Sequence, residues 1–307
     1  MKPNLMLTQK ISDLAEYAGI DLIGFTDASP FSDYALKESV RMDPKISMHD
    51  AQSIIVAGIY IGGLTLPVWA ELNYGRTSRL YLSGHFCDVV KPLEPIADLL
   101  RDEGYNSHIC KSAESKTSIL PLKLAAIRAG FGWQGKCSLL ITKKYGSYLA
   151  LGGIITNAPL EHNTTIDRNR CGRCEMCMKA CPTASLNVPY VIDKKSCLAY
   201  NLQMPEISVE VKRLAENRVG DCEICQDVCP WNQKHLQNPV PTKLTLSFRE
   251  KIAGWEKNFY LPDLVNIDET GYSETFGDLE TTIPFSVFHR NVVNALENAK
   301  NQTEKCS

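Results

Sequence analysis

The chain has 307 residues, of which 22% are charged and 44% hydrophobic, so it can bury a sizeable core in one large domain or two to three smaller ones. Its 33 Lys and Arg nearly balance its 35 Asp and Glu, which leaves a formal net charge of −2. These values exclude disordered, collagen-like and coiled-coil proteins, and they lack the basic excess typical of proteins that bind nucleic acid or anionic membranes. The unusual feature is the count of 12 cysteines.

The N-terminal segment and one uncharged stretch indicate the cellular compartment of the protein. Polar side chains interrupt the first 19 residues at helical spacing, which predicts an amphipathic helix and not a signal peptide. Residues 51–70 carry no charge, but residues 53–63 within them are β-branched and glycine-rich and are followed by Pro67. This pattern favours a buried parallel strand over a membrane span. We therefore expect a soluble, cytoplasmic protein without membrane association, in which clustered cysteines are metal ligands more often than disulfides.

Helical and strand patterns alternate over about the first 160 residues, which indicates an α/β (α+β) layer domain over residues 1–162. The predicted elements are a helix near Gln9–Tyr17, strands at 21–27 and Ser53–Tyr60, helices at Cys87–Asp102 and Leu120–Ala129, and strands at Ser138–Thr142 and Tyr148–Thr156. Gly104 is expected to end the second of these helices.

The pattern changes at about residue 163. Eight of the twelve cysteines lie between Arg168 and Trp231, where apolar periodicity is weak, so bound metal is expected to supply the order of residues 163–236. Residues 237–307 are polar at first and then predict one helix over Phe285–Ala299. This last segment is expected to form a short helical C-terminal cap.

The cysteine spacing indicates two 4Fe–4S clusters. Three thiolates two residues apart can hold three corners of a cluster, and a fourth cysteine followed by proline ligates the neighbouring cluster. The isolated Cys197 completes the second set. The expected ligands are Cys171, Cys174, Cys177 and Cys229 for the first cluster, and Cys181, Cys197, Cys222 and Cys225 for the second.

Zinc is the alternative, because it also binds paired cysteines in tetrahedral sites. Two such sites would need four Cys-x-x-Cys pairs, whereas this chain has a triple, an isolated cysteine and two Cys-Pro steps. Outside the motifs, Cys87 and Cys110 lie in apolar settings typical of buried small hydrophobic residues. The same interpretation is favoured for Cys137, although its glycine-rich loop leaves a functional role open.

Three segments carry a family resemblance: RAGFGWQGKCSLLITKKYGSYLALGGIITNAPL, CGRCEMCMKACPTASL and GDCEICQDVCPWN. Together they resemble the epoxyqueuosine reductase family, which comprises cobalamin-dependent iron–sulfur reductases that complete a modified base in tRNA and are distantly similar to reductive dehalogenases. The resemblance implies a cobalamin-binding domain, a two-cluster ferredoxin-like module and oxidoreductase activity. It also implies an external low-potential electron donor of the ferredoxin or flavodoxin type, with electrons passing through both clusters to a corrinoid cobalt.

The resemblance further implies a cofactor loop near the corrin, formed by Gly130, Gly132, Trp133, Gly135 and Lys136. Glycines allow close backbone approach to a flat ring, a Trp can cover an apolar face, and a Lys can meet the cofactor tail. The alternative is an ordinary glycine turn with a core Trp.

Two departures from the family bear on the substrate. Lys116 stands where the family has a proposed proton-donating Asp, so Lys116 is the candidate catalytic residue here. Residues 261–289 contain six acidic residues and no Lys or Arg, and such a surface repels phosphates. We therefore expect a small-molecule substrate more than tRNA. The alternative function is a ferredoxin-type electron carrier that reduces a corrinoid or a partner protein, although a pure carrier would not need the GFGWQGK loop.

Overall fold

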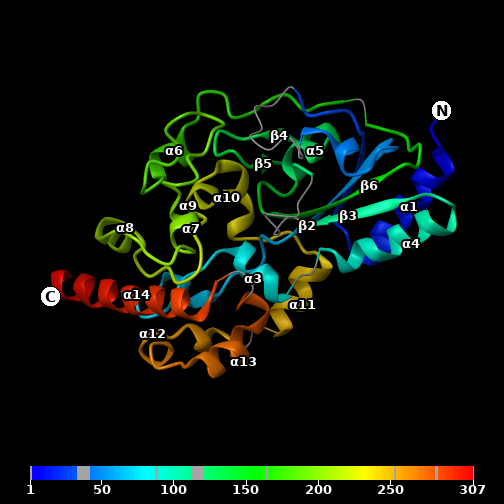
Figure 1. Ribbon diagram of the computed structural model, residues 1–307. Helices are drawn as coiled ribbons and strands as arrows, with labels where there is room; N and C mark the ends of the chain where they lie inside the picture. Colours follow the sequence, from blue (N-terminus) through cyan, green and yellow to red (C-terminus); the bar gives the residue numbers. More distant parts are fainter. Residues whose placement is uncertain are drawn as a thin grey trace. The chain divides into compact units, whose positions relative to one another are not determined.

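The computed structural model describes residues 2–32, 42–86, 89–111, 120–163, 165–251, 254–280 and 283–306. The chain divides into two compact units, whose elements are labelled in Figure 1. The first unit comprises Met1–Tyr60, Asp88–Gly135 and Leu139–Gly172, and the second comprises Ile61–Cys87, Lys136–Ser138 and Arg173–Ser307. Each unit is discontinuous in sequence, and the three continuous domains expected at 1–162, 163–236 and 237–307 stay a prediction.

The first unit is built on a four-stranded sheet with the order β1-β2-β6-β3. Its strands are β1 (Leu22–Asp27), β2 (Ser53–Tyr60), β6 (Leu149–Thr156) and β3 (Ser107–Lys111). Every neighbouring pair is antiparallel, so the parallel strand expected at residues 53–60 is wrong. All eight residues of β2 are buried, and this apolar run reflects burial of both faces and not strand direction.

Helices cover both faces of the sheet. Ile54 and Val56 of β2 pack in one hydrophobic cluster with α5 (Leu122–Arg128). The intervening residues of β2, beginning with Ile55, pack in a second cluster with α1 (Leu5–Ala18) and α4 (Glu94–Asp102). Successive side chains of a strand point to opposite faces, so one strand serves both cores. The expected mixed fold of helices and sheet is confirmed.

The helix ends follow local chemistry. The side-chain oxygen of Asn4 accepts a hydrogen bond of 3.0 Å from the backbone N–H of Leu7 at the start of α1. The helix predicted at Cys87–Asp102 begins only at Glu94, after the 3₁₀ turn η3 (Lys91–Leu93). Proline fits the first turn of a helix because its missing N–H would have no partner there, and α4 carries one in its first turn.

The remaining elements of the first unit are short. They are η1 (Pro44–Ile46) and a two-stranded hairpin of β4 (Trp133–Gln134) and β5 (Leu140–Ile141). The strand predicted at Ser138–Thr142 is therefore limited to two residues. Cys87 lies outside the described residues.

The second unit is helical. Its elements are η2 (Pro67–Ala70), α3 (Arg79–Phe86), α6 (Met176–Ala180), α7 (Leu198–Asn201), α8 (Val209–Leu214), α9 (Ile224–Asp227), α10 (Pro230–Leu236), α11 (Lys243–Lys251), η4 (Glu256–Phe259), α12 (Leu261–Leu264), α13 (Glu269–Glu280) and α14 (Phe285–Cys306). The helix predicted at Phe285–Ala299 is confirmed as part of α14, whereas α11 to α13 were not predicted. Within the described ranges, no helix combines the length and the apolar character that crossing a membrane requires.

An aromatic cluster packs α14 against the helices that precede it in sequence. The ring of Tyr272 in α13 lies 4.7 Å from that of Phe288 in α14, and the ring of Phe276 lies 5.2 Å from Phe288 and 5.5 Å from Phe259 (centroid distances). These four side chains are buried. The cluster gives the polar C-terminal segment its own hydrophobic core.

Substituting Gly132→Ala is expected to destabilise the protein by about 3 kcal/mol. A Cβ atom there would lie 2.0 Å from the carbonyl oxygen of Ile141, and backbone atoms of a paired strand cannot move aside. Chemical denaturation measures the loss. Gly277→Ala is the matched control, because a Cβ atom at that position would have no other atom within 4 Å and alanine favours a helix. Equal stability of both variants would contradict the prediction.

Candidate functional site

The two cysteine motifs adopt the same local conformation in the second unit. Each begins a short helix, α6 or α9, and the residue before the helix is a glutamate with nearly identical backbone angles. Glu175 has φ −132° and ψ 17°, and Glu223 has φ −132° and ψ 21°. Helices α6 and α9 pack against each other (Figure 1). The repeat in sequence is therefore also a repeat in structure.

The cysteines outside the two short helices are placed by the proline steps and by a small core. Cys181 follows α6 in an extended conformation, since proline at the next position prevents the helix from continuing. Cys229 precedes α10, and the proline after it fits the first turn of that helix. Cys197 precedes α7, whose Leu198 packs in a small core against which Cys222 also lies.

Four other thiols lie close enough to Cys225 for their charges to act on it. Cys225 interacts electrostatically with Cys222, Cys197, Cys177 and Cys181, the strongest of these interactions being with Cys222. Three of these partners, together with Cys225, form the set expected to hold the second cluster. The described cysteines are all free thiols. Of the expected ligands, Cys171 belongs to the first unit and the other seven to the second.

Burial dominates the protonation of the second motif. It raises the pKa of Cys222 to about 12, and it also raises the pKa of Cys197 and of Cys225. Thiols bind metal as thiolates, so metal binding at these cysteines must release protons. In the described part of the chain, no three His, Cys, Asp or Glu side chains are placed to hold a single metal ion.

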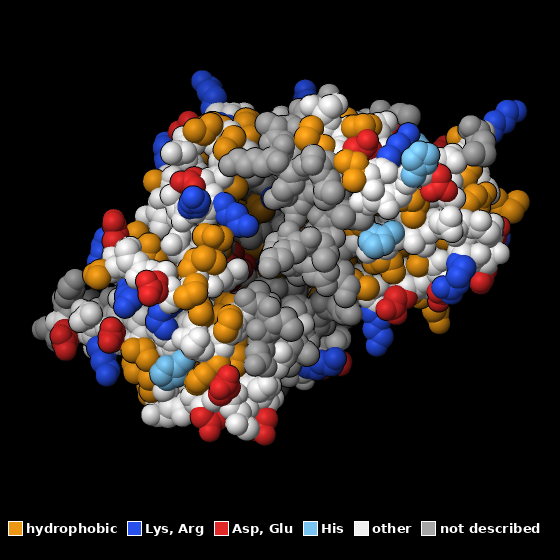
Figure 2. Space-filling view, in the orientation of Figure 1, with side chains coloured by type: hydrophobic (Ala, Val, Ile, Leu, Met, Phe, Trp, Pro, Cys, Tyr) orange, Lys and Arg blue, Asp and Glu red, His pale blue; other side chains and the backbone are white. Residues whose placement is uncertain are grey.

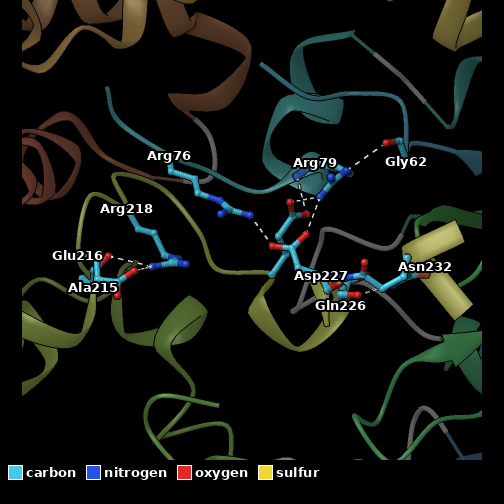
Figure 3. A network of polar contacts seen from close by, with 11 residues as sticks. Gly62, Arg76, Arg79, Ala215, Glu216, Arg218, Gln226, Asp227 and Asn232 are labelled. Atoms are coloured by element: carbon cyan, nitrogen blue, oxygen red, sulfur yellow. Dashed lines mark hydrogen bonds and ion pairs between the residues drawn. The ribbon is translucent and has the colours of Figure 1, made fainter. Parts of the chain in front are cut away.

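A buried ion-pair network holds the second motif (Figure 3). The Arg79 side chain is 5% exposed, and its guanidinium pairs with Glu223, which is 2% exposed. Arg79 also donates from its backbone N–H to Glu223 over 2.9 Å and from Nη1 to Asp227 over 3.1 Å. Arg76 pairs with Asp227 from the other side. Because Glu223 and Asp227 flank the expected ligand Cys225, the network fixes the backbone that carries it.

Further contacts join the same two segments beside the network. Ser78 donates from its hydroxyl to Asp221 over 2.5 Å, and Asp221 accepts the backbone N–H of Cys222 over 2.7 Å. Both arginines of the 76–79 segment also lie 5.7 Å from the centre of the Trp69 ring. The sequence analysis did not predict the ion pairs of residues 76–79 with the second motif. The basic RTSR segment and the acidic DCEICQD segment have complementary charge, which could have indicated them.

The expected cofactor loop is largely engaged within the first unit. Gly130 has φ +81°, and Trp133 is 2% exposed. The backbone N–H of Gly135 donates to the carbonyl of Leu139 over 2.8 Å. Packing within the chain thus explains why position 132 needs a glycine, and it also explains the buried indole of Trp133. The expected role of this loop at a corrin stays a prediction.

The tip of the loop belongs to the second unit. Lys136 is half-buried, and its carbonyl accepts the backbone N–H of Tyr190 over 3.0 Å. The candidate catalytic residue Lys116 lies outside the described residues.

Comparison with known proteins confirms the expected 4Fe–4S domain. Residues 170–232 match the family described as a 4Fe-4S double cluster binding domain. Over 238 residues the chain is 37% identical to an epoxyqueuosine reductase of Listeria monocytogenes, covering 67% of this chain and 59% of that protein. It is 30% identical over 222 residues to the epoxyqueuosine reductase of Bacillus subtilis, covering 64% of this chain and 56% of that protein. The chain thus spans less than two thirds of the length of these relatives.

Solved structures confirm the likeness of fold. A selenomethionine-labelled epoxyqueuosine reductase superposes with a TM-score of 0.77 at 23% identity, covering 97% of this chain and 83% of that one. An epoxyqueuosine reductase bound to an epoxyqueuosine-modified tRNA stem loop superposes with a TM-score of 0.75 at the same identity and coverage. A catabolic reductive dehalogenase reaches a TM-score of 0.54 at 19% identity, over 88% of this chain and 37% of that one.

Substituting Arg79→Met is expected to destabilise the protein by about 3–5 kcal/mol, because it leaves the buried Glu223 carboxylate without its partner. Chemical denaturation of the anaerobic protein measures this loss. Arg101→Met is the control, since Arg101 and its partner Asp98 are 70% and 58% exposed and such pairs contribute at most about 1 kcal/mol. A loss for Arg79→Met no larger than for the control would contradict the role of the network.

Substituting Cys181→Ala is expected to remove one cluster and leave the other, because the cysteine before proline ligates the cluster held by the other motif. Iron content should fall from about eight to about four atoms per chain, as measured by chemical analysis of anaerobic protein. Cys110→Ala, which changes a buried thiol outside the motifs, should retain all the iron. Full iron content in Cys181→Ala would refute the exchange of ligands.

Proposed function

Because the chain is a relative of the epoxyqueuosine reductases, we propose that it is an oxidoreductase that reduces its substrate with two 4Fe–4S clusters and a corrinoid. The observation that carries the proposal is the match of residues 170–232, which contain all eight expected cysteine ligands, to a double-cluster binding domain. The donor set fits iron–sulfur clusters, which cysteine thiolates hold in fours.

The clusters, the cysteines that bind them and the Arg79 network have distinct roles in this proposal. When bound, the clusters supply one-electron transfer from an external low-potential donor. Cys181, Cys197, Cys222 and Cys225 hold one of them. The Arg79 network keeps Cys222 and Cys225 at a fixed separation. Keeping these thiols reduced favours a cytoplasmic location.

The corrinoid is proposed from family likeness. A related dehalogenase structure is described as suggesting a mechanism for B12-dependent dehalogenation. A corrinoid would supply the low-valent metal that reduces the substrate. The loop residues fit this role only in part, because Gly132 and Trp133 are engaged inside the first unit. Lys136 remains the loop residue with a polar group suited to a cofactor tail.

Epoxyqueuosine in tRNA is the first candidate substrate. The structural neighbour with an epoxyqueuosine-modified tRNA stem loop argues against the small-molecule substrate that the sequence analysis favoured. We therefore propose the substrate of the relatives for this chain, in addition to their fold.

A different substrate is the second candidate, favoured by the charge of α12 and α13. Asp263, Asp268, Glu269 and Glu274 are exposed on and beside these helices. Figure 2 shows acidic side chains along the lower edge of the view, where Figure 1 draws α12 and α13. Exposed carboxylates repel the phosphates of a nucleic acid, so tRNA would have to approach another surface.

Turnover of tRNA that carries epoxyqueuosine decides between the two substrates. The native protein, prepared anaerobically with cobalamin and a chemical reductant, is expected to convert the modified base, which mass spectrometry of the nucleosides detects. Lys116→Asp should then keep or increase turnover, because aspartate restores the acidic group of the family. Lys123→Asp, the same charge change at an exposed position of α5, is the control and should leave turnover unchanged.

Other outcomes separate the alternatives. Turnover that appears only in Lys116→Asp would support a changed substrate for the native protein. Protein that carries both clusters and yet fails to bind cobalamin in calorimetry would favour the electron-carrier function instead.

A further inference from the structure

One buried side-chain amide joins the two segments that lead to Cys197 and Cys222. Asn291 lies on α14 and is 0% exposed. Its Nδ2 donates to the backbone carbonyl of Leu202 over 2.9 Å and to that of Val219 over 3.0 Å. An amide nitrogen carries two hydrogens, so these two carbonyls use its whole capacity to donate. The C-terminal helix is thereby bound to both segments at once.

The first segment runs from Cys197 to Leu202. Helix α7 begins directly after Cys197, and Leu202 follows its last residue. The backbone N–H of Leu202 donates to the carbonyl of Leu198 over 2.9 Å, so a single helical turn connects Leu202 rigidly to Cys197. The carbonyls at the end of a helix have no partner within it. Asn291 satisfies the carbonyl of Leu202, together with Nη2 of Arg290 over 3.2 Å.

The second segment runs from Val219 to Cys222. Val219 is 0% exposed, and its carbonyl accepts the hydrogen bond from Asn291 in the interior. Leu202 belongs to the small core against which Cys222 packs, so the two segments also meet through apolar side chains. Because a buried carbonyl without a hydrogen bond is costly, the amide ties the segment from Cys197 to the segment that leads to Cys222.

Arg290 fixes the orientation of this amide. Nη2 of Arg290 donates to Oδ1 of Asn291 over 2.7 Å, which leaves the NH₂ group facing the two carbonyls. Nη1 of Arg290 donates to the carbonyl of Pro205 over 2.9 Å, so the guanidinium is itself held. Both polar atoms of the Asn291 side chain therefore have partners, and the amide is held in one orientation.

We propose that Asn291 is a positioning residue that holds Cys197 and Cys222 at the separation required by the second cluster. The inference rests on the proposed function, because it requires both cysteines to be ligands of one cluster. Side chains that orient metal ligands without touching the metal typically change its affinity by a factor of about 10 to 100. Helix α14 carries none of the eight expected ligands, and through Asn291 it contributes to the retention of the second cluster.

The alternative is that Asn291 only fastens α14 to the rest of the second unit. Asn294 is the matched control, because it lies on the same helix, three positions further along, and is 5% exposed. Its Nδ2 donates to the carbonyl of Lys212 over 2.8 Å, within α8 and away from both cysteines in the sequence. A fastening role predicts equal effects of Asn291→Leu and Asn294→Leu on the retention of iron.

The test measures how fast an iron chelator removes iron from the anaerobic holoprotein. Asn291→Leu is expected to speed the release of about half of the iron, that of one cluster of two, by about tenfold. The remaining iron should leave at the native rate. Asn294→Leu should leave both rates unchanged.

Two further variants assign the affected cluster. Cys174→Ala should hold only the second cluster, and Cys181→Ala only the first. Adding Asn291→Leu should speed the release of iron from Cys174→Ala, or prevent its loading, and should not affect Cys181→Ala. The opposite assignment contradicts the inference.

The outcomes distinguish this inference from the function on which it rests. Native protein that binds no iron–sulfur cluster overturns the proposed function itself. Loaded Asn291→Leu that releases iron no faster than Asn294→Leu overturns the role of Asn291 and leaves the clusters in place. Equal acceleration for all the iron shows a general loss of stability, and the inference is wrong. If Asn291→Leu fails to fold, Asn291→Ser, which has a smaller side chain and keeps one donor, decides by the same measurement.

Discussion

The pairing of one buried arginine with two acidic residues is the constraint on which the cluster module depends. A charged side chain is costly to bury unless an opposite charge and hydrogen bonds accompany it. Arg79 meets this condition only with Glu223 and Asp227 in their observed places. These acids lie on either side of Cys225, so the pairing that satisfies the arginine also fixes the thiols. Residues 76–79 are thereby tied to a motif about 145 positions later.

The two motifs combine one local conformation with different surroundings. In the second motif, burial raises the pKa of Cys222 and of Cys225, and the Asp221 carboxylate adds to the rise at Cys222. In the first, a hydrogen bond with the Cys137 side chain is the largest cause that lowers the pKa of Cys177 to about 7. Cys174 is exposed, whereas Cys225 lies in the gathered set of thiols. Because charge, hydrogen bonding and exposure all act on an iron–sulfur cluster, two copies of one motif provide two distinct sites.

The sequence analysis succeeded where the signal was local. The helix over Phe285–Ala299 and the strand over Ser53–Tyr60 were visible as periodic or continuous apolar runs, and the 4Fe–4S domain was visible in the cysteine spacing. It failed where the signal depended on partners far along the chain. The direction of β2 was wrong because an apolar run reports burial alone. Helices α11 to α13 were missed because each contributes only a few buried apolar side chains among mostly polar residues.

The sequence by itself determined which residues are the candidates for the chemistry. Cysteine spacing is a covalent property of the chain, so eight candidate ligands and the likeness to epoxyqueuosine reductases could be read before any folding was considered. Only the tertiary structure decided what surrounds those ligands. The pairing of Arg79 with Glu223 joins residues 144 positions apart, and no local pattern records such a contact. Hydrogen bonds and buried charges act over a few ångströms in space, whatever their separation along the chain.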